Sequence, residues 1–152
     1  MKLAEALMLR ADAQKRVEQI KQRLTRSARV QEGEKPPENP ATLIEELDRT
    51  LAQLVDLVKR INRTNAATEF STGATLADIL ANRDVLALKR KALEDLIEAA
   101  TVRQDRYSRS EVKYLCTFDI AETQTAIDDL AKKYRELDTE IQETNWRIDL
   151  SE

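Results

Sequence analysis

Residues 120–148 read IAETQTAIDDLAKKYRELDTEIQETNWRI, and this stretch decides the fold. Within it, a row of apolar residues and threonines advances by three and four positions without a break. That spacing places the whole row on one stripe of a helix about four heptads long. The row is Ile120, Thr123, Ile127, Leu130, Tyr134, Leu137, Ile141, Thr144 and Ile148. The stretch predicts a long helix that packs against another helix.

The composition points to the same class of fold. The 152 residues include only two glycines and three prolines, whereas 35% are charged. Such a composition is typical of long, solvated helices. We therefore predict one all-α domain over residues 1–152, built as a four-helix, coiled-coil-like bundle of long antiparallel helices.

Helices are expected over 2–30, 40–63, 75–102 and 119–147, with Asn39 as the N-cap of the second. The first two should form an antiparallel hairpin roughly 40 Å long. The first helix carries the heptad row Leu3, Ala6, Arg10, Ala13, Val17, Ile20 and Leu24. The second carries Ile44, Leu47, Leu51, Leu54, Val58 and Ile61, with Leu43 and Leu57 beside them. The third carries Leu76, Ile79, Leu86, Leu93, Leu96, Ile97 and Ala100, interrupted by Arg83 and Arg90.

A short alternating segment lies between the third and fourth helices. Residues 111–118 alternate with a period of two, which is the period of a strand. The segment 64–72 is rich in β-branched residues, so a small two-stranded β ribbon between 64–72 and 111–118 is predicted. Cys116, which lies in the alternating stretch, is expected to be buried and inert.

The charges are unevenly distributed along the chain. Eight basic and three acidic residues fall within 1–31, whereas four basic and ten acidic residues fall within 119–152. Opposite charges favour side-by-side packing of the first and last helices, within one chain or between two.

Several function classes are disfavoured. The chain lacks histidine and has one cysteine, which removes Ser-His and Cys-His nucleophile pairs and Glu-x-x-His metal ligands. Neither glycine belongs to a phosphate-binding loop. The acidic sets Glu140/Glu143 and Glu94/Asp95/Glu98 are interpreted as solvated faces, so we expect no cofactor, no metal and no enzymatic activity. Without a signal-like or membrane-spanning stretch, a cytoplasmic location without a membrane partner is expected.

One polar set is harder to explain as scaffold. It comprises Asn62, Arg63, Asn65, Arg83, Asp84, Arg103, Asp105, Arg106, Tyr107 and Arg109. The set can be a network of salt bridges and hydrogen bonds that fixes helix register, which is the favoured interpretation. Alternatively, it can bind a small anionic ligand or nucleic-acid phosphate. All its parts would meet only in an oligomer or if residues 104–118 fold back along the bundle.

Four segments resemble a family of uncharacterised bacterial helical proteins, some of which carry the label septicolysin. The segments are MKLAEALMLRADAQKRVEQIKQRL at 1–24, INRTNAAT at 61–68, RQDRYSRSEVKYL at 103–115 and YRELDTEIQETNW at 134–146. The resemblance implies a domain of unknown function without established catalytic residues. The label implies a cytolysin, which the strongly charged helices argue against.

Two functional hypotheses follow. The first is a non-enzymatic, cytoplasmic helical protein that self-associates as a homo-oligomer through its amphipathic helices. The second is a binding module that uses the polar set to hold an anionic ligand or nucleic-acid phosphate, with nucleic acid the less favoured partner.

Overall fold

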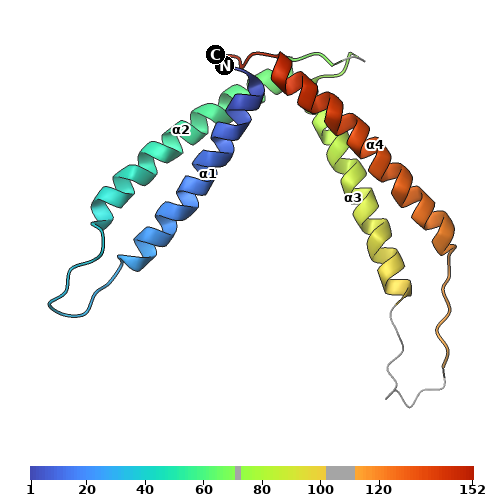
Figure 1. Ribbon diagram of the computed structural model, residues 1–152, viewed down its shortest axis with the longest axis horizontal. Coiled ribbons are helices and arrows are strands. Elements are labelled where there is room, and N and C mark those ends of the chain that lie inside the picture. The colour runs from blue at the N-terminus through green and yellow to red at the C-terminus, as the bar shows by residue number, and fades with distance from the viewer. Residues whose placement is uncertain (71–72, 102–111) are drawn as a thin grey trace. The chain divides into compact units, whose positions relative to one another are not determined.

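The computed structural model describes residues 1–70, 73–101 and 112–152. The described residues form four helices, α1 (Leu3–Arg26), α2 (Pro40–Ala67), α3 (Leu76–Ala100) and α4 (Ile120–Arg147), as Figure 1 shows. The predicted all-α class is confirmed. The helix boundaries agree closely, except that α1 ends four residues earlier than expected and α2 runs four residues further.

The chain divides into two compact units. The first unit comprises Met1–Leu76 and Gln142–Glu152, and contains α1, α2 and the end of α4. The second comprises Ala77–Ile141 and contains most of α3 and α4.

In the first unit, α1 and α2 lie side by side as an antiparallel hairpin (Figure 1). The predicted row of α1 forms its buried face, and Leu3 and Ile20 are fully covered. Arg10 occupies a seam position, and its half-buried side chain keeps a covered Nε without a hydrogen-bond partner. Asn39 is the N-cap of α2, as predicted, because its side chain accepts a 2.9 Å hydrogen bond from the Ala41 amide.

The seam of α2 is rotated relative to the predicted one. The buried face is the row Leu43, Leu47, Thr50, Leu54, Leu57, Ile61 and Thr64. Ile44 is instead 50% exposed, and Leu51 is also exposed. The rotation is possible because the Thr50 and Thr64 hydroxyls donate to the Glu46 and Arg60 carbonyls, at 2.9 and 2.8 Å. A threonine bonded in this way can be buried in a helical seam without another polar partner.

Ion pairs reinforce the hairpin of α1 and α2. Arg16 and Arg23 on α1 both reach Glu46 on α2, each at 3.2 Å. Arg23 also donates to Glu38 in the connecting segment, with Nε 2.9 Å from Oε2. Two basic residues of α1, Arg16 and Arg23, are therefore paired with an acidic residue of α2. The predicted side-by-side packing of α1 with acidic α4, within one chain or between two, stays a prediction.

In the second unit, α3 and α4 are joined by contacts between Arg83, Arg90, Tyr134 and Asp138. Ile127 and Leu130 are buried on α4, as the nine-residue stripe predicts. Ile120, the first member of that stripe, is the exception with 38% exposure.

The predicted β ribbon is not found in the described residues. Residues 64–67 belong to the last turn of α2, and Glu69 forms an isolated antiparallel bridge with Thr75. Gly73, which precedes this bridge partner by two residues, has a φ of 77°, a conformation that glycine adopts readily. Residues 112–118 form no strand, and Val112, Tyr114 and Cys116 of the alternating row are exposed, whereas Phe118 is half-buried.

Cys116 is exposed, so its predicted burial is wrong. Its thiol donates to the Phe118 carbonyl at 3.1 Å. Because the segment has no partner strand among the described residues, its alternating pattern does not translate into burial. Among the helical residues described, no helix is long and apolar enough to cross a membrane.

Candidate functional site

Arg83 is the centre of a polar cluster between α3 and α4. Its NH1 group donates a 2.8 Å hydrogen bond to Asp138 Oδ1, and its Nε donates to Asp84 Oδ1 at 3.2 Å. The guanidinium also lies 5.9 Å from the centre of the Tyr134 ring. Arg90, two helical turns further along α3, lies 5.8 Å from the same centre. Tyr134 thus contacts two cations, which an aromatic face attracts through its quadrupole.

The electrostatics of this cluster keep Arg83 charged. Partial burial opposes the charged form, but hydrogen bonds to Asp138 and Asp84 outweigh it and raise the pKa of Arg83 above its ordinary value. Arg90 is bound less completely, because its buried Nε makes no hydrogen bond and lies 3.7 Å from Glu94 Oε1. The cluster therefore has the properties of a register-fixing network, with its acids and bases already paired.

The Asn62–Asn65 part of the predicted set lies at the end of α2, where it meets residues 148–152, here termed the C-terminal strap. Arg63 donates to the backbone carbonyl of Glu152 at 2.8 Å. The Thr64 hydroxyl accepts from the Ser151 amide at 2.9 Å. Asn62 is exposed and Asn65 is half-buried. Arg63 thus has a structural partner in the strap.

The strap also binds the beginning of the chain. The Leu3 amide donates to the Ile148 carbonyl at 3.1 Å, and the Leu150 amide donates to the Met1 carbonyl at 2.9 Å. Lys2 forms a 3.0 Å ion pair with Asp149 and, through that hydrogen bond, lowers the pKa of the carboxyl. Leu150 is buried. The strap therefore fastens the first residues of α1 to the end of α2.

The predicted set is thus divided between two places. Arg63 contacts the strap in the first unit, whereas Arg83 and Asp84 contact each other, with Arg83 also reaching Asp138, in the second unit. The remaining predicted members lie outside the described residues. These are Arg103, Asp105, Arg106, Tyr107 and Arg109.

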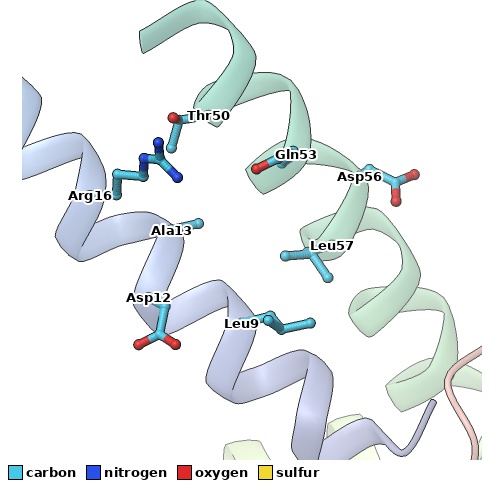
Figure 2. A pocket seen from close by; sticks show the side chains of 8 residues that line it. All are labelled: Leu9, Asp12, Ala13, Arg16, Thr50, Gln53, Asp56 and Leu57. Carbon is cyan, nitrogen blue, oxygen red and sulfur yellow. The ribbon is translucent and has the colours of Figure 1, made fainter. Parts of the chain in front are cut away.

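A groove that sequence reasoning missed lies between α1 and α2, and Figure 2 shows it from close by. Its volume is about 440 Å³. Leu9, Ala13 and Leu57 supply its apolar lining. Its polar lining comes from Asp12, Arg16, Thr50, Gln53 and Asp56. The small side chains of Ala13 and Thr50 at seam positions were the available signal, because small residues in facing rows leave space between helices.

A second hollow, here termed the basic hollow, lies at the end of the hairpin where α1 leads into the connection to α2. Its volume is about 540 Å³. Arg26, Arg29 and Lys35 bring three cations to it, and Glu34 brings one carboxylate. The excess of positive charge is the kind of feature that attracts anions. None of these residues belongs to the predicted polar set.

Metal binding gains no support from side-chain placement. Within residues 1–70, 73–101 and 112–152, no three His, Cys, Asp or Glu side chains are grouped so that they could hold a metal ion. The polar and concave features described above are therefore the paired cluster around Arg83, the strap and the two hollows.

Residues 10–150 match the model of a family of unknown function, DUF6847. The chain belongs to this family. A solved structure, the crystal structure of a functionally unknown conserved protein from Corynebacterium diphtheriae, is similar to it with 50% sequence identity and a TM-score of 0.90. The similarity covers 99% of each chain. No curated protein matches this DUF6847 member.

These relationships confirm the resemblance to an uncharacterised helical family and leave the function unknown. The family is described as one of unknown function, and the Corynebacterium diphtheriae protein as functionally unknown, so neither description names a cytolytic activity. The label septicolysin therefore has no support for this member of DUF6847.

Proposed function

We propose that this DUF6847 member is a non-enzymatic, cytoplasmic helical protein whose function is self-association, by coiled-coil-like packing between helices of two or more copies. The support comes from apolar rows that remain exposed after each hairpin has formed. On α2 these residues are Ile44, Leu51 and Val55, and on α3 they are Val85, Leu88 and Leu96. Val85 and Leu88 are 61% and 69% exposed, although both lie inside a regular helix.

An exposed row of this kind favours association. A two-helix hairpin can cover only one stripe of each helix, so a second apolar stripe stays in water. Removing apolar surface from water contributes roughly 25 cal/mol per Å². Contiguous apolar patches on soluble proteins commonly mark interaction surfaces. The paired cluster around Arg83 supports the same proposal, because it holds α3 against α4 without needing a ligand.

Light scattering of purified protein over about 1–200 µM tests this proposal, across the usual affinity range for such assemblies. The expected result is a mass that rises with concentration to a multiple of the 17.4 kDa chain. A mass equal to one chain at every concentration would overturn the proposal.

The basic hollow supports a second candidate function, binding of an anionic ligand or nucleic-acid phosphate. Arg26, Arg29 and Lys35 converge there against one carboxylate, Glu34. We therefore assign anion binding to the basic hollow and not to Arg63 and Arg83, which are hydrogen-bonded to the Glu152 carbonyl and to Asp138.

Fluorescence anisotropy with a short single-stranded RNA tests the second candidate at low and at physiological salt. Binding that weakens with salt and is lost in Arg29→Glu/Lys35→Glu would support it, because phosphate contacts release counterions. Lys132→Glu/Lys133→Glu, on exposed positions of α4, is the matched control. No binding at low salt would exclude the nucleic-acid version, and added inorganic phosphate would test the small-anion version by a thermal shift.

A further inference from the structure

The exposed apolar row of α3 extends beyond Val85, Leu88 and Leu96. Six apolar residues are spaced by four, three, four, four and three positions, and all six are exposed. They are Ala81, Val85, Leu88, Ala92, Leu96 and Ala99. Val85 and Ala92 each follow by two residues an arginine that contacts α4, namely Arg83 and Arg90. Two residues correspond to about 200° around a helix, so the row lies on the side of α3 away from α4.

The order of side-chain sizes along the row fits an antiparallel copy of itself. If a two-fold axis passes near Leu88, Val85 of one copy faces Ala92 of the other, and Ala81 faces Leu96. Val85 and Leu96 then each meet an alanine, and the two Leu88 side chains meet at the centre. A two-fold contact requires such self-complementarity, because the same patch serves both subunits.

The charges beside the row are complementary in the same register. Asp84 and Lys91 lie one heptad apart on one flank of the row, where Asp84 pairs with Arg83 at 3.0 Å and Lys91 pairs with Asp95 at 2.7 Å. The antiparallel arrangement places Asp84 of one copy beside Lys91 of the other, twice by symmetry. Each contact then joins four charges of alternating sign, Arg83 and Asp84 of one copy with Lys91 and Asp95 of the other. Lys89, on the other flank, meets its own symmetry mate, but its flexible stem lets the ammonium turn to solvent.

We propose that the Ala81–Ala99 row of α3 is a self-association surface, and that its partner is the same row of a second copy in antiparallel orientation with Leu88 at the centre. This inference rests on the proposed function and assigns that function to one helix face. Apolar contact between the two rows supplies the affinity, and the Asp84–Lys91 contacts determine the orientation.

Charge reversal tests the orientation. Asp84→Lys alone places two lysines together at both contacts, and Lys91→Asp alone places two aspartates together. Each variant should therefore weaken self-association about tenfold or more. A mixture of the two variants forms one lysine–aspartate contact of reversed sign and one of wild-type sign. The mixture should therefore associate with nearly wild-type affinity, measured by sedimentation velocity with one variant labelled.

Disulfide trapping tests the centre of the contact. Because Cys116 is the one cysteine of the chain, Leu88→Cys in a Cys116→Ser background leaves one thiol at position 88. Mild oxidation should convert this variant to a covalent dimer, with Asp129→Cys in the same background as an unreactive control on exposed α4. Helical circular dichroism checks that each exposed substitution keeps the fold.

The outcomes separate this inference from the proposed function. A wild-type protein that is monomeric at all concentrations overturns both. A wild-type protein that associates, while Asp84→Lys and Lys91→Asp associate equally well alone and Leu88→Cys does not cross-link, overturns only the α3 surface. Rescue in the mixture together with cross-linking at position 88 supports it.

Discussion

Arg83 on α3 and Asp138 on α4 share a 2.8 Å hydrogen bond, although 55 positions separate them in the chain. Both side chains are partly buried. This pair, together with the Tyr134 ring, makes the α3–α4 seam partly polar. A seam of this kind specifies which residues face each other, since a shifted register leaves a covered charge unpaired.

Asp138→Ala should destabilise the protein by about 1–2 kcal/mol, because it removes the acceptor of the Arg83 hydrogen bond in a partly covered position. Urea unfolding followed by circular dichroism measures the change. Glu136→Ala is the control, since that exposed carboxylate lies 4.0 Å from Lys132 in the same helix. Equal losses for the two variants would show that the Arg83 pair has no special role.

Leu130→Asp should destabilise the protein by several kcal/mol, because Leu130 is buried in the α4 stripe and an aspartate there would lack a counter-charge. Asp129→Asn, one position away and exposed, should be nearly silent. Thermal melting of the two variants compares them directly. Similar melting temperatures would mean that the stripe does not form the α4 seam.

The α1–α2 hairpin should lose stability in acid. Hydrogen bonds from Arg16 and Arg23 lower the pKa of Glu46, and a hydrogen bond from Arg23 lowers the pKa of Glu38, both from an ordinary value of 4.5. A carboxyl with a lowered folded-state pKa stabilises the protein above its unfolded-state pKa. This contribution is lost as the pH falls below about 4.5 and through the folded-state values.

The melting temperature of Glu46→Gln should therefore fall less than that of wild type between pH 6 and pH 3. The wild-type protein, which keeps the titrating group, should show the steeper decline. Glu45→Gln, an exposed neighbour, serves as the control and should follow wild type. A Glu46→Gln profile parallel to that of wild type would contradict the assigned role of the Arg16 and Arg23 contacts.

Thr64→Val should release the C-terminal strap locally. Valine keeps the volume of threonine but lacks the hydroxyl that accepts from the Ser151 amide, so about 1 kcal/mol should be lost. Hydrogen exchange should then show faster exchange of the Ser151 amide. Thr139→Val removes an exposed hydroxyl that donates to the Arg135 carbonyl, and it should leave the exchange of the Ser151 amide unchanged. Unchanged protection in Thr64→Val would contradict the strap contact.

The helices could be predicted from the sequence because their apolar rows and caps are local signals. The heptad from Leu3 to Leu24 and the cap at Asn39 both agree with the structure. The predicted seam of α2 follows apolar residues alone, whereas the observed seam also runs through the buried Thr50 and Thr64. Their hydroxyls bond to the preceding turn and remove the cost of burial.

The candidate site was harder to predict because backbone contacts leave little trace in sequence. The strap accepts hydrogen bonds through the backbone carbonyls of Ile148, Ser151 and Glu152, which any residue at those three positions would supply. Arg63 and Arg83 belong to the predicted polar set. Their partners, however, could be found only from three-dimensional geometry. The alternation in residues 112–118 led to a wrong strand prediction, because a period of two indicates a strand only where one face of the segment is covered.

The strap also has a consequence for the order of folding. Its contacts join Lys2 to Asp149 and Thr64 to Ser151, whereas the α1–α2 hairpin joins residues much nearer in sequence, such as Arg23 and Glu46. Contacts between near neighbours close small loops and form fast, whereas distant contacts carry a larger loop-closure entropy. The hairpin should therefore assemble early and the strap should dock late. The junction of Met1, Thr64 and Leu150 should then be the last part of the first unit whose backbone amides become protected from hydrogen exchange during folding.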